Sequence, residues 1–131
     1  MNWAFTFISD KLEIPVGLLA AMCSVESNHT NAINWNDAGS PSVGICQMKV
    51  KTAKEVGCTA SDRLNPPKAV ECAGRYLAKQ HKRFKSWDKA LCYYNTGRPL
   101  PSCEYSRKVK GRRMKYIVKK FQIDERVADV R

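Results

Sequence analysis

Apolar residues recur at helical spacing along most of the chain. After Ser86, for example, four apolar residues follow at i, i+3, i+4 and i+7, which places them on one face of a helix. They are Trp87, Ala90, Leu91 and Tyr94. Residues that typically start or stop helices bound such segments. The pattern predicts helices from Asn2, from Pro15 to about Ser27, over 51–56, from Pro66 to about Phe84, from Ser86 onward and from about Glu104 to Phe121.

Strand signals are nearly absent. The segment 28–42 is rich in Asn, Asp, Gly, Ser and Pro, which is typical of a loop, and at most a short hairpin fits within 33–48. The length of 131 residues is enough for one hydrophobic core, and no repeat or linker divides it. We therefore expect a predominantly α fold in a single domain that spans residues 1–131.

The chain is strongly basic, with 23 Lys and Arg against 12 Asp and Glu and a net charge of +11. Such a charge favours a polyanionic partner: nucleic acid, anionic lipid or the bacterial envelope. The chain has no apolar run long enough to span a membrane, and its N-terminal segment has neither a basic leader nor a small-residue cleavage site. We expect this segment to be part of the fold, so export would use another route or a signal already removed.

The six cysteines show no metal-binding pattern. None pair as CxxC, and none combines with His29 or His81 at zinc spacing, so we expect no metal or other cofactor. Most lie in apolar surroundings such as AAMCSV and ALCYY, where a free cysteine acts as a small hydrophobic residue. A soluble domain of this size needs no disulfide framework. Free thiols are therefore favoured, although a bridge such as Cys58 with Cys72 stays open.

One carboxylate stands in an unusual place. Glu26 directly follows the apolar stretch GLLAAMCSV, where a helix is expected to be buried. A charge at that position costs free energy unless it is paired or put to use. Pairing with a nearby Lys or Arg is the structural alternative to a catalytic role.

Four short motifs follow one another along the chain. They are VESN with Glu26 and Ser27, SVGICQM with Gly44, Gln47 and Met48, YYNTG with Tyr94, Asn95 and Gly97, and LPSCEYSRKV with Glu104, Tyr105 and Val109. In this order and at this spacing they resemble the lytic transglycosylase domain of the soluble type, from about Pro15 to Val109. The resemblance implies a lysozyme-like helical fold of the goose type and an enzyme that cleaves bacterial peptidoglycan.

The resemblance gives Glu26 a chemical role. Cleavage of a glycosidic bond needs an acid to protonate the leaving oxygen, and the transition state resembles an oxocarbenium ion. Desolvation at the end of an apolar helix raises the pKa of a carboxyl, so that Glu26 can hold a proton near neutral pH. In the family the same residue then acts as the base toward the 6-hydroxyl of the sugar, which yields a 1,6-anhydromuramoyl end.

The resemblance also implies a set of substrate-binding residues. Gln47 binds sugar near the acid, and Met48 lines the cleft. Tyr94 and Asn95 border the cleft. The alternatives are a core amide satisfied by the backbone for Gln47 and a core position for Tyr94.

Tyr105 is the strongest candidate after Glu26. In the family the matching hydroxyl lies close to the catalytic glutamate, where it can tune the acid or steady developing charge; an ordinary helix-packing tyrosine is the alternative. Ser27 either holds the carboxyl of Glu26 or forms the turn that follows. The chain departs mildly from the family at Cys46, where Met, Leu or Phe is usual, and at Cys92, where Ala is usual.

Asp37 is an alternative second acid. Goose-type lysozymes use loop aspartates after the glutamate to position a water, and Asp37 lies in a comparable loop, eleven residues past Glu26. At a separation of roughly 6.5–9.5 Å from the first acid, such a residue would allow hydrolysis. Turn formation in a loop rich in Asn, Gly and Ser is its structural alternative.

The segment RKVKGRRMKYIVKK carries a dense basic stripe. Its apolar positions fall on one helix face: Met114, Ile117, Val118 and Phe121. The basic residues therefore form an outer stripe, which is either a plain solvated face or a contact surface for anionic envelope lipid or polysaccharide. Nucleic-acid binding would use the same charge, but it leaves the four motifs unexplained. An inactive scaffold domain would most readily have lost its acid, whereas Glu26 is present.

The sequence thus predicts a peptidoglycan lytic transglycosylase with Glu26 as acid and base, and a goose-type muramidase that uses Asp37 is the alternative. Peptidoglycan is the expected partner, no specific nucleic acid is expected, and the chain is expected to be monomeric. The small size, the positive charge and the missing leader favour a phage endolysin or a virion-associated lysin, which would pass from the host cytoplasm to the cell wall. A conjugation or secretion-system enzyme is the next choice.

Overall fold

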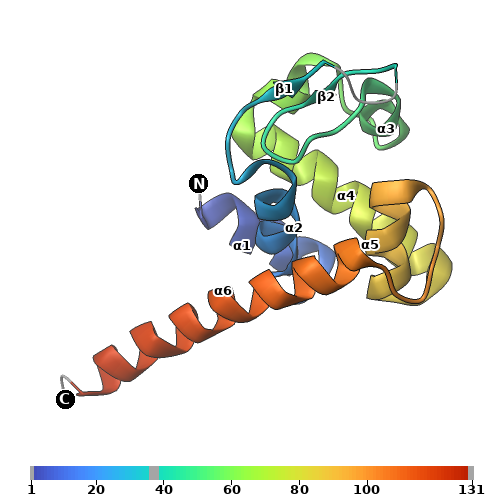
Figure 1. Cartoon of the computed structure of the whole chain (residues 1–131). Coiled ribbons are helices and arrows are strands. Elements are labelled where there is room, and N and C mark those ends of the chain that lie inside the picture. The colour runs from blue at the N-terminus through green and yellow to red at the C-terminus, as the bar shows by residue number, and fades with distance from the viewer. Residues whose placement is uncertain (1, 36–38, 130–131) are drawn as a thin grey trace.

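The computed structural model describes the backbone of residues 2–35 and 39–129 and the side chains of residues 3–35 and 39–117. Helices dominate the described chain, as expected, and a two-stranded antiparallel hairpin accompanies them (Figure 1). In chain order the elements are α1 (Asn2–Leu12), α2 (Leu18–Ser27), β1 (Ile33–Asn34), β2 (Ser42–Val43), α3 (Val50–Glu55), the 3-10 helix η1 (Ser61–Leu64), α4 (Pro66–Phe84), α5 (Trp87–Thr96) and α6 (Glu104–Asp129).

Local capping fixes the helix starts that the sequence predicts best. The Asn65 side chain accepts a hydrogen bond from the Lys68 amide at the start of α4, where Pro66 occupies the first position. Ser86 does the same for the Lys89 amide at the start of α5, at 3.2 Å. Both bonds satisfy amide groups that have no partner within the helix, so α4 and α5 begin where predicted.

Two predicted helix boundaries are wrong. The second helix begins at Leu18 rather than Pro15, because Gly17 adopts a left-handed conformation with φ +78° that a helix cannot include. The last helix does not end near Phe121 but continues to Asp129. In Figure 1 its distal part extends away from the other elements. The 3-10 helix over 61–64 was not predicted either.

The hairpin pairs Ile33 with Val43 and Asn34 with Ser42. The chain then folds back at once, because Val43 and Met48 exchange backbone hydrogen bonds of 3.0 and 3.1 Å. The four residues between them form a tight loop, called here the 44–47 loop. This loop ends on Gln47 and lies between the hairpin and α3.

The core is built around α2 and α4. Helix α6 packs along α2, whereas α4 contacts α1, α2, α3, α5 and η1. The largest fully buried apolar side chains come from α2, the residue after the 44–47 loop, α4, α5 and α6: Leu19, Met22, Met48, Val70, Leu77, Leu91 and Val109. Among the described residues no helix is both long and apolar enough to cross a membrane. The result is a lysozyme-like helical fold, in agreement with the sequence.

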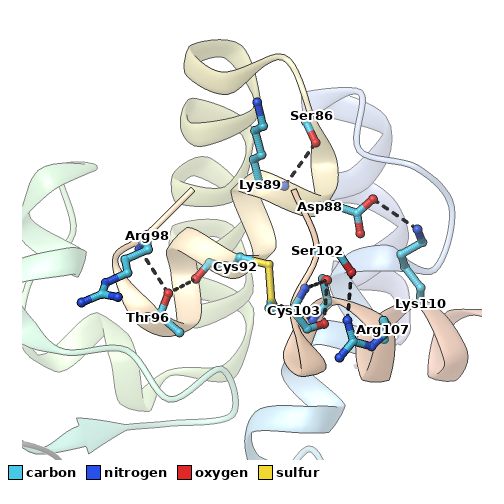
Figure 2. Close-up of a disulfide and its surroundings, with 11 residues drawn as sticks. Ser86, Asp88, Lys89, Cys92, Thr96, Arg98, Ser102, Cys103, Arg107 and Lys110 are labelled. Atoms are coloured by element: carbon cyan, nitrogen blue, oxygen red, sulfur yellow. Dashed lines mark hydrogen bonds and ion pairs between the residues drawn. A yellow bond between two sulfur atoms is a disulfide. The ribbon is translucent and has the colours of Figure 1, made fainter. Parts of the chain in front are cut away.

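All six cysteines form disulfides, so the expectation of free thiols is wrong. The pairs are Cys23–Cys46, Cys58–Cys72 and Cys92–Cys103. Figure 2 shows the third pair, which joins the middle of α5 to the residue just before α6. The expectation failed because each cysteine was judged by its local apolar surroundings, whereas a disulfide depends on which residues the fold brings together.

Gly44 is required by a close approach between two backbone segments. It has φ +87°, and a Cβ placed on it would lie 1.8 Å from the carbonyl oxygen of Arg63. Arg63 in turn donates from Nη1 to the Met48 carbonyl at 3.0 Å. The first residue of the 44–47 loop therefore has no room for a side chain.

We predict that Gly44→Ala lowers the free energy of unfolding by about 3 kcal/mol or more, since it adds a backbone clash to conformational strain. Gly57→Ala is the matched control. Gly57 also has a positive φ, +79°, but a Cβ placed on it would meet nothing within 4 Å, so its loss should be only about 1–2 kcal/mol. Urea denaturation measures both values, and equal losses would contradict the clash.

Candidate active site

Glu26 lies in the last turn of α2, where its side chain is half-buried. The hydroxyl of Tyr105, from the first turns of α6, donates a 2.8 Å hydrogen bond to its Oε1. Tyr105 is itself only 8% exposed, so the hydroxyl is held by packing as well as by this bond. Two residues 79 positions apart in the chain are thus brought into direct contact.

Three links hold the 44–47 loop beside the end of α2. The Cys23–Cys46 disulfide joins them covalently. The Ser27 hydroxyl donates to the carbonyl of Ile45 and also lies 3.3 Å from the carbonyl of Cys23. Ser27 therefore supports the loop, whereas its own carbonyl accepts the bonds of the turn that follows α2.

The third link comes from α5. The Tyr94 hydroxyl donates a 2.7 Å hydrogen bond to the carbonyl of Cys46, and the Tyr94 ring packs edge-on against Tyr76. Tyr94 thus combines a core position with contact to the loop, so its two sequence interpretations are compatible. The loop is fixed from α2 on one side and from α5 on the other.

Gln47 sits in a left-handed conformation with φ +49°, which is costly for a residue with a side chain. Its amide nitrogen donates to the carbonyl oxygens of Ala32, at 2.9 Å, and Gly44, at 2.8 Å. Because both partners are acceptors, the NH₂ group must face them, and its two hydrogens are used. The amide oxygen of Gln47 is therefore the side-chain atom suited to accept a hydrogen bond from a ligand.

These residues surround a hollow of about 170 Å³. The lining residues are Glu26, Ser42, Gln47, Met48, Lys49, Thr52, Tyr94 and Asn95. Five of them were predicted as site residues from the sequence, and Ser27 and Tyr105 support the site through the bonds described above. Within this described lining Glu26 is the only acid.

Sequence reasoning missed three lining residues, Ser42, Lys49 and Thr52. Ser42 is the first residue of the SVGICQM motif and Lys49 directly follows it, so the motif was a usable signal for both. Thr52 comes from α3, and nothing in its local sequence marks it. Asp37, the alternative second acid, lies outside the described residues.

Burial dominates the electrostatics of the two site tyrosines. Burial raises the pKa of Tyr105 well above its ordinary value, and the nearby negative charge of Glu26 raises it further. The pKa of Tyr94 is raised for the same two reasons, in the same order. Both hydroxyls therefore keep their protons at neutral pH and remain hydrogen-bond donors.

The chain offers no convincing metal centre in its described part. One group of possible ligands, Cys58, Asp62 and Cys72, has its ligand atoms within 4.8 Å of one another. Both cysteines are joined in a disulfide, so neither supplies the thiolate that a metal would need. None of the three residues lines the hollow.

The transglycosylase SLT domain family matches residues 4–115. The chain belongs to this family. Membership makes peptidoglycan its substrate and cleavage of the lytic transglycosylase type its activity at the family level. No curated protein matches the chain at a significant level. The part of α6 beyond residue 115 lies outside the SLT match, and the hollow with Glu26 lies within it.

In this SLT domain, the free energy of unfolding should decrease at high pH, because the buried tyrosines ionise more easily in the unfolded state than in the folded state. The pKa of Tyr76 is raised to about 12, chiefly by burial, and the pKa values of Tyr94 and Tyr105 are raised as well. A raised pKa means that the folded state keeps a proton that the unfolded state loses above about pH 10. The stabilisation is complete below about pH 10 and is lost as the pH rises toward the folded-state pKa.

We predict that the free energy of unfolding falls by about 1.4 kcal/mol per pH unit above about pH 10 for each such tyrosine. Tyr105→Phe should show a smaller fall than the wild type between about pH 9 and 11, as measured by urea denaturation. Ultraviolet absorbance titration should show that some tyrosines of the folded protein ionise well above pH 10, whereas in concentrated urea all of them ionise near about pH 10. If every tyrosine of the folded protein ionised near about pH 10, the prediction would be contradicted.

Proposed function

We propose that the chain is a lytic transglycosylase that cleaves the β-1,4 bond between N-acetylmuramic acid and N-acetylglucosamine, with Glu26 as general acid and then base. The observation that carries the proposal is the hydrogen bond from a buried tyrosine to the one acid that lines the described hollow. This arrangement presents a fixed carboxyl to a ligand in the hollow. No metal or other cofactor enters the proposed reaction.

Tyr105 determines which carboxyl oxygen carries the proton. Its hydroxyl donates to Oε1 of Glu26, and its raised pKa keeps it a donor. Oε1 is therefore the acceptor of this bond, and the proton to be transferred is assigned to Oε2. In the first step Glu26 gives that proton to the leaving glycosidic oxygen while an oxocarbenium-like transition state develops.

The second step reverses the role of Glu26. The carboxylate takes the proton of the 6-hydroxyl on the muramoyl sugar, and this oxygen attacks the anomeric carbon to close a 1,6-anhydro ring. One carboxylate suffices because the nucleophile belongs to the substrate and is already positioned. The Tyr105 bond strengthens as the carboxylate becomes charged, so it stabilises the ionised state formed midway.

The hollow suits a segment of a long polymer better than an enclosed small molecule. Its volume of about 170 Å³ is below the roughly 300–1,000 Å³ of pockets that enclose drug-sized ligands. A glycan strand would therefore lie along it with only the reacting sugars inserted. The amide oxygen of Gln47 and the exposed Asn95 side chain provide hydrogen-bonding groups for sugar hydroxyls, and Lys49 adds a cation.

We predict that Glu26→Gln lowers turnover of purified peptidoglycan about 10³-fold or more, since it removes the acid and the base at once. Glu104→Gln is the control, because Glu104 is an exposed carboxylate at the start of α6, next to Tyr105. It should retain nearly full activity. Turnover is measured by release of soluble muropeptides. A Glu26→Gln protein with wild-type turnover would show that Glu26 is not the acid and base of the reaction.

Mass spectrometry of the same digest decides between lyase and hydrolase. Ends of the 1,6-anhydromuramoyl type support the proposal, whereas reducing ends formed with added water would show a muramidase. In the second outcome Asp37→Asn tests whether the loop aspartate positions the water. The family match is compatible with either product, and the single acid in the described lining of the hollow supports the first.

The exposed face of α6 provides a second element of the proposal, contact with the anionic bacterial envelope. Lys108 and Lys115 are exposed on this helix, and Lys110 pairs with Asp88 at 3.2 Å (Figure 2). Where α6 leaves α2, a hollow of about 450 Å³ also has a basic lining: Ser24, Asn28, Arg112, Lys115 and Tyr116. Lys108 and Lys115 therefore place positive charge on the solvent-exposed side of the helix that supplies Tyr105, whereas Arg112 of the same helix donates to Ser24 on α2.

We predict that Lys108→Gln with Lys115→Gln weakens binding to vesicles of phosphatidylglycerol and phosphatidylcholine by about 30-fold at roughly physiological salt, since each cation contributes about 1 kcal/mol at an anionic surface. The control is Lys54→Gln with Lys82→Gln, two lysines on α3 and α4, which removes the same charge elsewhere. Vesicle sedimentation measures both variants. An equal loss in the control would assign the effect to net charge alone.

A further inference from the structure

The Cys23–Cys46 disulfide lies next to two residues of the proposed active site, Glu26 and Gln47. Cys23 lies three residues before Glu26 on α2, about one helical turn away, and Cys46 directly precedes Gln47. We propose that the Cys23–Cys46 disulfide is a positioning element of the active site, so that cleavage of peptidoglycan requires its oxidation. This inference rests on the proposed function, because it concerns the geometry of the same site.

The disulfide connects the two parts of the site whose separation matters most. One part is the end of α2, which carries the acid, and the other is the 44–47 loop, which carries the sugar-binding amide. Both sulfurs are in fully buried residues, each 0% exposed. Two non-bonded thiols need more room than two bonded sulfurs, and a close-packed interior has no such room. Reduction therefore has to move the loop relative to the helix.

The remaining links cannot fully replace the covalent one. The Ser27 and Tyr94 hydroxyls each donate one hydrogen bond to a carbonyl of this loop, and such bonds bend and lengthen more easily than a covalent bond. The loop therefore depends on the disulfide for a fixed position relative to α2.

The oxidation step is a thiol–disulfide exchange that balances. The thiolate of one cysteine attacks an external disulfide, such as glutathione disulfide, and releases one thiol. The second cysteine then attacks the mixed disulfide and releases the second. Two protons and two electrons leave the protein, and one external disulfide becomes two thiols. Both cysteines are fully buried in the folded protein, so reduction of the bond requires local opening of the fold.

The Cys58–Cys72 disulfide is a matched control. It connects the segment after α3 with α4, and neither cysteine lines the hollow. The bridged residues are 14 positions apart, against 23 for Cys23 and Cys46. Because the effect of loop length is logarithmic, removing either bond should lower the thermal midpoint by a similar amount.

The test compares Cys23→Ala/Cys46→Ala with Cys58→Ala/Cys72→Ala, both checked for native near-UV circular dichroism and assayed well below their thermal midpoints. We expect the first variant to lose about 100-fold in kcat, since a displacement near 1 Å can cost that much, with KM within about threefold. The second variant should keep kcat within about twofold of the wild type. Equal kcat values for the two variants would overturn the inference.

A second measurement needs no substitution near the site and serves if the first variant does not fold. The reduced Cys58→Ala/Cys72→Ala protein is refolded with glutathione disulfide, and samples are quenched with iodoacetamide. Peptide mapping follows each remaining disulfide while activity is assayed. Activity that rises with the Cys23–Cys46 bond supports the inference, and activity that precedes it overturns the inference. Oxidised wild type that leaves peptidoglycan intact would instead overturn the proposed function and the inference with it.

Discussion

The hydrogen bond from Tyr105 to Glu26 depends on the packing of α6 along α2. The bond needs the end of one helix to meet the start of another, so the two helices must keep a fixed alignment. Val109 of α6 is fully buried, and Arg112 donates to the carbonyl and the hydroxyl of Ser24, the latter at 2.7 Å. Further along, the Arg113 side chain donates to a backbone carbonyl just before α2 at 2.7 Å. The geometry of the acid is therefore set by contacts along the length of α2.

The opposite side of the site is held differently. The 44–47 loop has little secondary structure of its own, and its position follows from one glycine without room for a side chain, one disulfide and hydrogen bonds to its carbonyls. Such a loop presents polar groups to a ligand at the cost of local strain, which the left-handed Gln47 shows directly. A helix pair thus carries Glu26, the proposed acid, while a cross-linked loop carries Gln47, the residue proposed to bind sugar.

Sequence reasoning predicted the helices better than the contacts between them. Caps and apolar spacing are local patterns, so α4 and α5 were located correctly, and the family motifs constrain the acid, the amide and both tyrosines of the candidate site. The start of α2 was misplaced because Gly17 takes its conformation where Tyr116 of α6 lies against it. Nothing near Cys23 in the sequence indicates that the fold places Cys46 beside it, or that Thr52 reaches the hollow from α3. Such features depend on three-dimensional neighbours that have no fixed spacing in the chain.

In the proposed reaction Glu26 must hold a proton at the start, and nearby cations favour the ionised form of a carboxyl. Two cations lie on the side of the site: Lys49 lines the same hollow as Glu26, and Arg112 of α6 donates to the carbonyl and the hydroxyl of Ser24 on α2. Lys108 and Lys115 are exposed to solvent, where charges are screened over about 8–10 Å. The exposed lysines of α6 therefore affect Glu26 less than a cation in the hollow does, while Tyr105 of the same helix brings an uncharged hydroxyl to its Oε1.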